Sequence, residues 1–251
     1  MAKTNKRDYI TQILEVRGRL SPTSKRWNLV STRMAKIEQV SNLLSFLGEV
    51  ENIDSETLSA IFEVTPELGE LEDYTEIRYE LARYIPISLV ACFEGYFRLV
   101  YANLINQRKP FRENVVKFEK KIDFGLEHLV SIERNSISLG EFVAHFLPCN
   151  TIEDINNNMS TITGQDFLRL VKRKYPELVP SLFPEMFTSE GMVVTIKQIF
   201  ELRHMYCHEL NPPLEEKDSS WVRFCKAASE FLLTSEDIVE EFLSSKEESA
   251  T

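Results

Sequence analysis

The residues with the clearest capacity for chemistry lie together in one hexapeptide, Arg203-His204-Met205-Tyr206-Cys207-His208. An arginine carries a permanent positive charge and a fork of N–H donors that suits phosphate oxygens. A histidine can take or give a proton near neutral pH. One such group can handle the proton of an RNA 2′-hydroxyl or leaving oxygen while the other stabilises charge on the phosphorus. Arg203 and His208 are therefore candidate catalytic residues, and this chemistry requires no metal or other cofactor.

The spacing of these two residues places a condition on that chemistry. Five steps at about 100° per residue leave Arg203 and His208 roughly 140° apart on a straight α-helix, so they share an edge of the helix but not one face. A bend, or a cleft that wraps the helix, would bring both to one phosphate. The helix should end soon after them, because Asn211-Pro212-Pro213 follows.

Other interpretations of the same residues stay open. Arg203 and His208 can be a structural polar pair at a helix end. His204 and His208 stand at i and i+4, which is also a metal-ligand spacing, but no obvious third ligand is present, so we predict no metal site. Glu94 lies upstream in an apolar stretch, where it can form an i,i+4 salt bridge with Arg98.

Helices dominate the expected secondary structure. Only 8 of the 251 residues are glycine, and apolar residues recur at three- and four-residue steps, which indicates an all-α fold. Pro86 should bend or split the longest helix, and the three prolines within 176–184 should mark an irregular connection. The expected helices span 8–17, 29–47, 54–62, 74–107, 113–133, 138–147, 163–175, 191–210 and 218–244.

Two phrases in the chain resemble a known family. HEPN domains (higher eukaryotes and prokaryotes nucleotide-binding) are α-helical bundles marked by an arginine, four to six further residues, and a histidine, usually with a polar residue after the arginine. The phrase IFELRHMYCHEL, which contains Arg203, His204 and His208, is similar to that motif. The phrase LVACFEGYFRLVYANL, with Glu94 inside it, looks like the first long helix of many bacterial members. The resemblance covers about residues 76–245.

The resemblance implies an activity and a role for each residue. Many members are metal-independent endoribonucleases, typically homodimers whose two motifs meet in one composite cleft, and bacterial members often act as toxins or in defence against phage. Carried over here, Arg203 would hold and polarise the phosphate, and His208 would be the general acid or base. His204 would be a supporting substrate-binding group, and Glu94 would orient Arg203 or contact the substrate. Some members have lost catalysis, so the alternative is a non-catalytic RNA-binding or protein-interaction module, antitoxin-like or a scaffold.

The chain is expected to have two parts with a seam near residue 75. These are an N-terminal helical region, 1–75, and a HEPN-like helical bundle, 76–251. RNA is the expected partner of the second part, and a partner protein could bind through the first.

Charge is distributed unevenly along the chain. The net charge is −10, yet residues 1–48 hold nine Lys and Arg against three Asp and Glu, and residues 49–76 hold ten acidic residues and no basic one. Basic residues cluster at 108–121 and 169–174. An acidic total does not exclude a local basic groove, although such clusters are also typical of a solvated helix face.

The apolar stretches and the cysteines of the chain indicate where in the cell the protein is expected. The window Ile85 to Ile105 is about as long as a membrane span, but Glu94 and Arg98 near its middle are costly in lipid, so we predict a buried core helix and no membrane contact. The first residues carry charge without a following apolar run, so no secretory signal is expected. The four cysteines form no CxxC pair, which is typical of reduced thiols. We therefore expect a cytoplasmic protein.

Overall fold

Helices make up all the regular structure of the described residues. The computed structural model describes residues 26–51, 74–107, 109–118, 130, 133, 137–178, 188–208 and 218–244. No strand occurs in these ranges, so the predicted all-α class is confirmed. The elements are α2 (Arg26–Glu51), α5 (Tyr74–Asn106), α6 (Phe111–Asn114), the 3-10 helix η2 (Val115–Phe118), α8 (Leu139–Phe146), α9 (Ile152–Thr163), α10 (Phe167–Leu178), α11 (Ser189–His208) and α12 (Asp218–Ser244).

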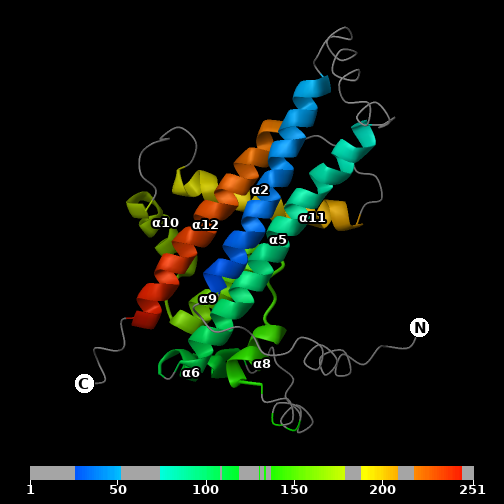
Figure 1. Ribbon diagram of the computed structural model, residues 1–251. Coiled ribbons are helices and arrows are strands. Elements are labelled where there is room, and N and C mark those ends of the chain that lie inside the picture. Colours follow the sequence, from blue (N-terminus) through cyan, green and yellow to red (C-terminus); the bar gives the residue numbers. More distant parts are fainter. Residues whose placement is uncertain are drawn as a thin grey trace.

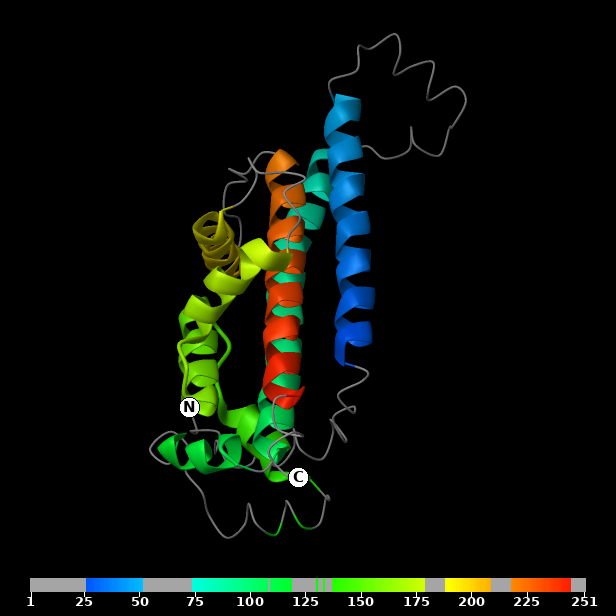
Figure 2. The ribbon, with the colours of Figure 1, turned by 90° about the vertical axis from the view of Figure 1, so that its left-hand side faces the viewer.

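Three long helices form the centre of the fold. α2, α5 and α12 run alongside one another (Figures 1 and 2). Each has an apolar stripe at helical spacing, and these stripes are buried between the helices. Phe93 and Phe97 of α5 meet Phe231 of α12, with ring centroids 5.8 Å and 5.9 Å apart. Such offset aromatic contacts add to the stabilisation from buried apolar area.

The helices α9 and α10 cover the side of this bundle opposite to α2, while α6 and α8 lie at one end of it (Figures 1 and 2). Figure 2 shows α9 and α10 on that side, and Figure 1 shows α11 lying crosswise to the long helices. Phe200 of α11 packs against Phe93 of α5, with ring centroids 5.6 Å apart, and Phe167 of α10 packs against Phe97, at 5.8 Å. α11 therefore packs on α5 through Phe200. This contact positions the hexapeptide at the C-terminal end of α11.

α2 shares its hydrophobic core with the helices that follow residue 75. Val30, Met34, Ile37 and Leu44 of α2 are buried in the same cluster as the apolar residues of α5 and α12. The described part of the N-terminal region thus packs on the helices of 76–251. The seam near residue 75 stays a prediction about how the sequence is organised.

Most of the predicted helices are confirmed within the described residues. Ser138 begins α8 as expected: its hydroxyl accepts from the Glu141 backbone N–H at 3.2 Å, and the Glu141 carboxylate accepts from the Ser138 N–H at 2.8 Å. The segments 8–17 and 54–62 lie outside the described residues. The confirmed ranges are 29–47, 74–107, 138–147, 191–208 and 218–244, and α10 overlaps the predicted range 163–175 from residue 167 onward.

The structure corrects four of the expected features. Pro86 was expected to bend or split the longest helix, and it lies inside α5, which continues through it as one helix, so of these two outcomes the split is wrong. Pro176 lies inside α10 rather than in an irregular connection. The expected helix at 113–133 is a short α-helix followed by a 3-10 turn up to Phe118, and most of its remainder lies outside the described residues. The helix α9 was not predicted at all.

One described segment, Tyr79–Asn106 of α5, is long and apolar enough to cross a membrane by length and composition. In the fold, 67% of its most apolar window is buried. The core helix of a soluble protein gives the same result. The cytoplasmic location and the absence of membrane contact therefore remain predictions.

Gly140 marks a close approach of α8 to α5, and its substitution is expected to destabilise the fold. A Cβ there would collide with the Ala102 carbonyl oxygen and lie 2.7 Å from Asn106 Oδ1, which accepts a hydrogen bond from the Gly140 N–H at 2.9 Å. Because backbone cannot move aside cheaply, we expect Gly140→Ala to lower the free energy of unfolding by about 1–3 kcal/mol. Urea denaturation followed by circular dichroism measures it.

Gly95→Ala is the matched control. A Cβ at this position in α5 meets nothing within 4 Å, and alanine is the better helix former. Its stability should equal or exceed that of the wild type. A Gly140→Ala variant as stable as Gly95→Ala would contradict the close approach.

Candidate functional site

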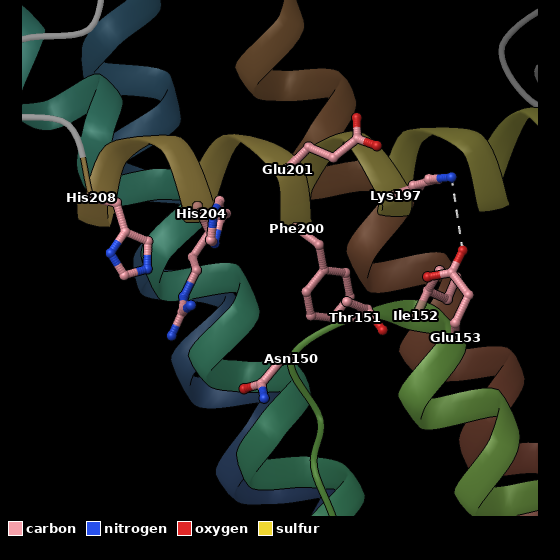
Figure 3. A pocket seen from close by; sticks show the side chains of 10 residues that line it. Asn150, Thr151, Ile152, Glu153, Lys197, Phe200, Glu201, His204 and His208 are labelled. Carbon is pink, nitrogen blue, oxygen red and sulfur yellow. Dashed lines mark ion pairs between the residues drawn. The ribbon is translucent and has the colours of Figure 1, made fainter.

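A pocket of about 590 Å³ opens beside α11. One wall is α11 itself, and the other is the α8–α9 connection with the first turn of α9 (Figure 3). The volume lies in the range of small-molecule sites. The lining residues are Asn150, Thr151, Ile152, Glu153, Lys197, Phe200, Glu201, Arg203, His204 and His208.

Three of the four candidate residues line this pocket. They are Arg203, His204 and His208. The two imidazole rings are neighbours, with centroids 4.6 Å apart and planes inclined at 54°, and Figure 3 shows them at one end of the pocket. Both histidines are exposed, and the Arg203 side chain is 30% exposed. The pocket wraps enough of α11 that residues roughly 140° apart on the helix reach one cavity.

Glu94 lies behind the arginine. One of its carboxylate oxygens is 3.9 Å from Arg203 Nη2, and the other is 3.7 Å from Arg98 Nη2. Both the salt bridge with Arg98 and the pairing with Arg203 that the sequence indicated are present. Glu94 is not among the residues that line the pocket. Its geometry fits the positioning of Arg203, and direct contact with a substrate stays a prediction.

Arg83 ties the last turn of α11 to α5, although nothing in the sequence singled it out. Its Nη2 donates to the Tyr206 carbonyl oxygen at 3.0 Å, while its Nη1 is 3.1 Å from a Glu80 carboxylate oxygen. The carbonyl of Tyr206 is one of the last four in the helix, which have no partner within the helix. A basic side chain is a suitable donor to such a group. Arg83 therefore holds the end of α11 that carries both histidines.

The opposite wall of the pocket is held by its own hydrogen bonds. Asn158 is fully buried and donates from Nδ2 to the Pro148 carbonyl oxygen at 2.7 Å. Thr151 caps α9 by accepting from the Asp154 N–H at 3.0 Å, and the Asp154 carboxylate accepts from the Asn150 N–H at 3.2 Å. These bonds define the path of the connection, so a fixed backbone faces α11 across the pocket.

The end of the pocket away from the histidines carries charged residues that were not predicted. Lys197 Nζ lies 3.9 Å from Glu153 Oε1, and both side chains are more than half exposed. Glu201 is also exposed on α11. A signal for part of this set exists in the sequence: Lys197, Glu201, His204 and His208 stand at i, i+4, i+7 and i+11, which is one stripe of a helix. Glu153 comes from a different helix, and no local pattern points to it.

Metal binding and nucleophilic thiol chemistry are two other possible uses of a pocket of this kind. In the part of the chain that the structure describes, no group of three or more His, Cys, Asp or Glu side chains is arranged to hold a metal ion. Cys149 adjoins the pocket wall but is buried, and this burial raises the pKa of its thiol to about 11. It therefore stays protonated at neutral pH and is a poor nucleophile.

The described residues of the basic clusters do not contribute to the lining of the pocket. Lys172 is 3.7 Å from a Glu190 carboxylate oxygen, and Lys174 is 3.1 Å from Asp237 and 2.6 Å from Glu241. None of the described residues at 109–118 or 169–174 lines the pocket. Lys172 and Lys174 therefore belong to a solvated helix face with acidic neighbours.

Comparisons of this chain with protein-family models, with curated proteins and with solved structures each found no match. The site is therefore interpreted from its own geometry and chemistry.

Proposed function

We propose that this chain is an endoribonuclease of HEPN type that cleaves single-stranded RNA without a metal ion. One observation carries the proposal: Arg203, His204 and His208 converge on one open pocket. An arginine and two imidazoles supply a phosphate-binding charge and two groups that transfer protons near neutral pH. A cavity of this size suits one splayed-out nucleotide of a single strand rather than a duplex.

The three side chains divide the work of phosphodiester cleavage. The 2′-oxygen bonds to phosphorus as the bond from phosphorus to the 5′-oxygen breaks, which leaves a 2′,3′-cyclic phosphate on one fragment and a 5′-hydroxyl on the other. One imidazole takes the proton of the 2′-hydroxyl, and the other, in its protonated form, gives a proton to the departing 5′-oxygen. Arg203 donates to the non-bridging oxygens and offsets the charge that they gain.

The surroundings of these side chains support such roles. Arg203 sits between the pocket and the Glu94 carboxylate, 3.9 Å away, which limits its orientations. The histidine pair is restrained by its ring contact and by the bond from Arg83 to the Tyr206 carbonyl. Groups fixed before the substrate arrives need less reorganisation during the reaction.

The HEPN resemblance extends the proposal to assembly and biological role. It includes a cytoplasmic homodimer whose two pockets meet, acting as a toxin or in defence against phage. The exposed histidine rings leave room for a second motif across an interface. A partner protein that binds within residues 1–75 would contact the outer face of α2 or the remainder of this region, because the apolar face of α2 is buried.

The proposal is tested with purified full-length protein, single-stranded RNA and a chelator. We expect fragments that end in a 2′,3′-cyclic phosphate, and no cleavage at a 2′-deoxy position, because the attacking oxygen is then missing. Binding of the deoxy-substituted strand should persist and should weaken with added salt, since phosphate contacts release counterions. Binding without cleavage of any RNA would favour the non-catalytic RNA-binding alternative, and the absence of both would contradict the proposal.

A further inference from the structure

The two ends of the pocket differ in charge. Arg203 and the two imidazoles stand at one end, while the ion pair of Glu153 and Lys197 stands at the other (Figure 3). The first end attracts a phosphate, whereas the carboxylate and the ammonium group of the second end offset each other and do not. An RNA that places its phosphate at the histidines therefore directs an uncharged part of the nucleotide toward the Glu153–Lys197 pair.

The middle of the pocket is suited to that uncharged part. The helical rise of about 1.5 Å per residue puts Lys197 and His204, seven residues apart, about 10 Å apart along the axis of α11. Phe200 and Ile152 line the pocket, and Figure 3 shows Phe200 between the histidines and the pair formed by Lys197 and Glu153. An apolar edge flanked by polar ends matches a nucleoside, whose base carries its hydrogen-bonding groups at its far edge.

The pair formed by Glu153 and Lys197 has open hydrogen-bonding capacity. Glu153 Oε1 and Lys197 Nζ are 3.9 Å apart, which is beyond hydrogen-bond distance. Their side chains are 58% and 57% exposed, and exposed pairs of this kind contribute little to stability. The Glu153 carboxylate, an acceptor, and the Lys197 ammonium group, a donor, thus stand side by side. Because their mutual attraction is weak, replacing it with contacts to a base costs little free energy.

We propose that this end of the pocket recognises the base of a guanosine, an inference that rests on the proposed ribonuclease function. Guanine presents two neighbouring N–H donors, N1–H and N2–H, beside the O6 acceptor. The Glu153 carboxylate accepts from both donors, and the Lys197 ammonium donates to O6. Adenine and cytosine present a ring-nitrogen acceptor where the carboxylate requires a donor, and uracil presents one N–H between two carbonyl oxygens. Guanine alone offers the carboxylate two neighbouring donors together with an acceptor for the ammonium group.

The test uses full-length protein and a set of oligouridylates, each carrying one guanosine, adenosine or cytidine at the same internal position. We expect cleavage beside guanosine to exceed cleavage beside the other bases by about tenfold or more. Glu153→Gln should remove this preference while cleavage beside uridine continues, and Lys197→Gln should reduce it. Equal cleavage beside all bases by the wild type, or a preference that survives Glu153→Gln, would overturn the inference while leaving the ribonuclease function intact.

Glu190→Gln is the matched control. Like Glu153, Glu190 stands in the first turn of a helix, is well exposed, and pairs with a lysine, at 3.7 Å, but it lies outside the pocket. Glu190→Gln should keep the full guanosine preference. Loss of the preference in this variant would overturn the assignment of base recognition to Glu153.

Binding of the same strands separates this inference from the proposed activity. If the protein does not cleave RNA, a binding preference for guanosine that Glu153→Gln removes still supports the base site, and its absence overturns it. Competition by guanosine monophosphate against adenosine monophosphate shows whether a free nucleotide occupies the site as well as a guanosine within RNA does. Failure to bind any of these probes would overturn both the base site and the proposed function.

Discussion

Replacing His208 with alanine is expected to slow RNA cleavage by about 10²–10⁴-fold, the range that one positioned acid–base group contributes. His208 is the last residue of α11 and is exposed, so its removal should leave the fold and the binding of RNA nearly unchanged. Arg203 would still hold the phosphate. The single-turnover cleavage rate, measured with chelator present, tests the prediction.

Cys207→Ala is the control for this substitution. Cys207 precedes His208 in the same turn and is exposed, but it does not line the pocket. Its cleavage rate should stay close to that of the wild type. Equal rates for the wild type and His208→Ala would remove His208 from the mechanism, and equally reduced rates for both variants would attribute the loss to the helix end rather than to the imidazole.

The sequence predicts the part of this site that lies on one helix. The spacing of Arg203, His204 and His208 is local, so their placement near the end of α11 could be deduced from the helical pattern and the prolines that follow. Whether Arg203 and His208 share a cavity could not be deduced, because that depends on what packs beside α11. The facing wall comes from Asn150 to Glu153, about fifty residues earlier in the chain. Only tertiary structure brings such segments together.

α9 shows why a real helix can escape detection. Its centre is Asn156-Asn157-Asn158, and asparagine is a weak helix former. The helix is supported instead by its ends and by one buried face: Thr151 caps its start, and Gly164 ends it with φ +76°, a conformation that favours glycine. Asn158 faces inward because its amide holds the Pro148 carbonyl. Tertiary contacts and caps thus outweigh propensity.

The start of α2 illustrates a charged residue whose burial the sequence does not reveal. Arg26 is fully buried, and its Nε and Nη2 donate to the Glu236 carboxylate at 2.9 Å and 2.8 Å, with Nη2 also donating to Glu240 at 2.9 Å. Tyr96 donates to Glu236 at 2.8 Å. The burial of Tyr96, together with the negative charge of Glu236, raises the pKa of the Tyr96 phenol well above its ordinary value. The phenol therefore keeps the proton that it donates to Glu236. One arginine therefore joins α2 to both α5 and α12.

Arg26→Met is expected to lower the free energy of unfolding by about 3–5 kcal/mol, because breaking a buried ion pair leaves a charge without compensation. Most of the penalty falls on Glu236, whose side chain is 15% exposed, since Glu240 is 52% exposed and can turn to water. Urea denaturation followed by circular dichroism measures the loss. Arg223→Met on α12 is the matched control: this exposed arginine donates to Gln198 at 3.1 Å, and its removal should cost under about 1 kcal/mol.

A double variant separates the charge from the packing of α2. Arg26→Met combined with Glu236→Gln removes the orphaned carboxylate but leaves an amide oxygen that can still accept from Tyr96. If the uncompensated charge causes the loss, the double variant should be more stable than Arg26→Met alone, so the two substitutions are far from additive. A double variant no more stable than Arg26→Met alone would show instead that Arg26 stabilises the fold through its packing between the helices. It would also show that the Glu236 carboxylate tolerates its charge when Arg26 is absent.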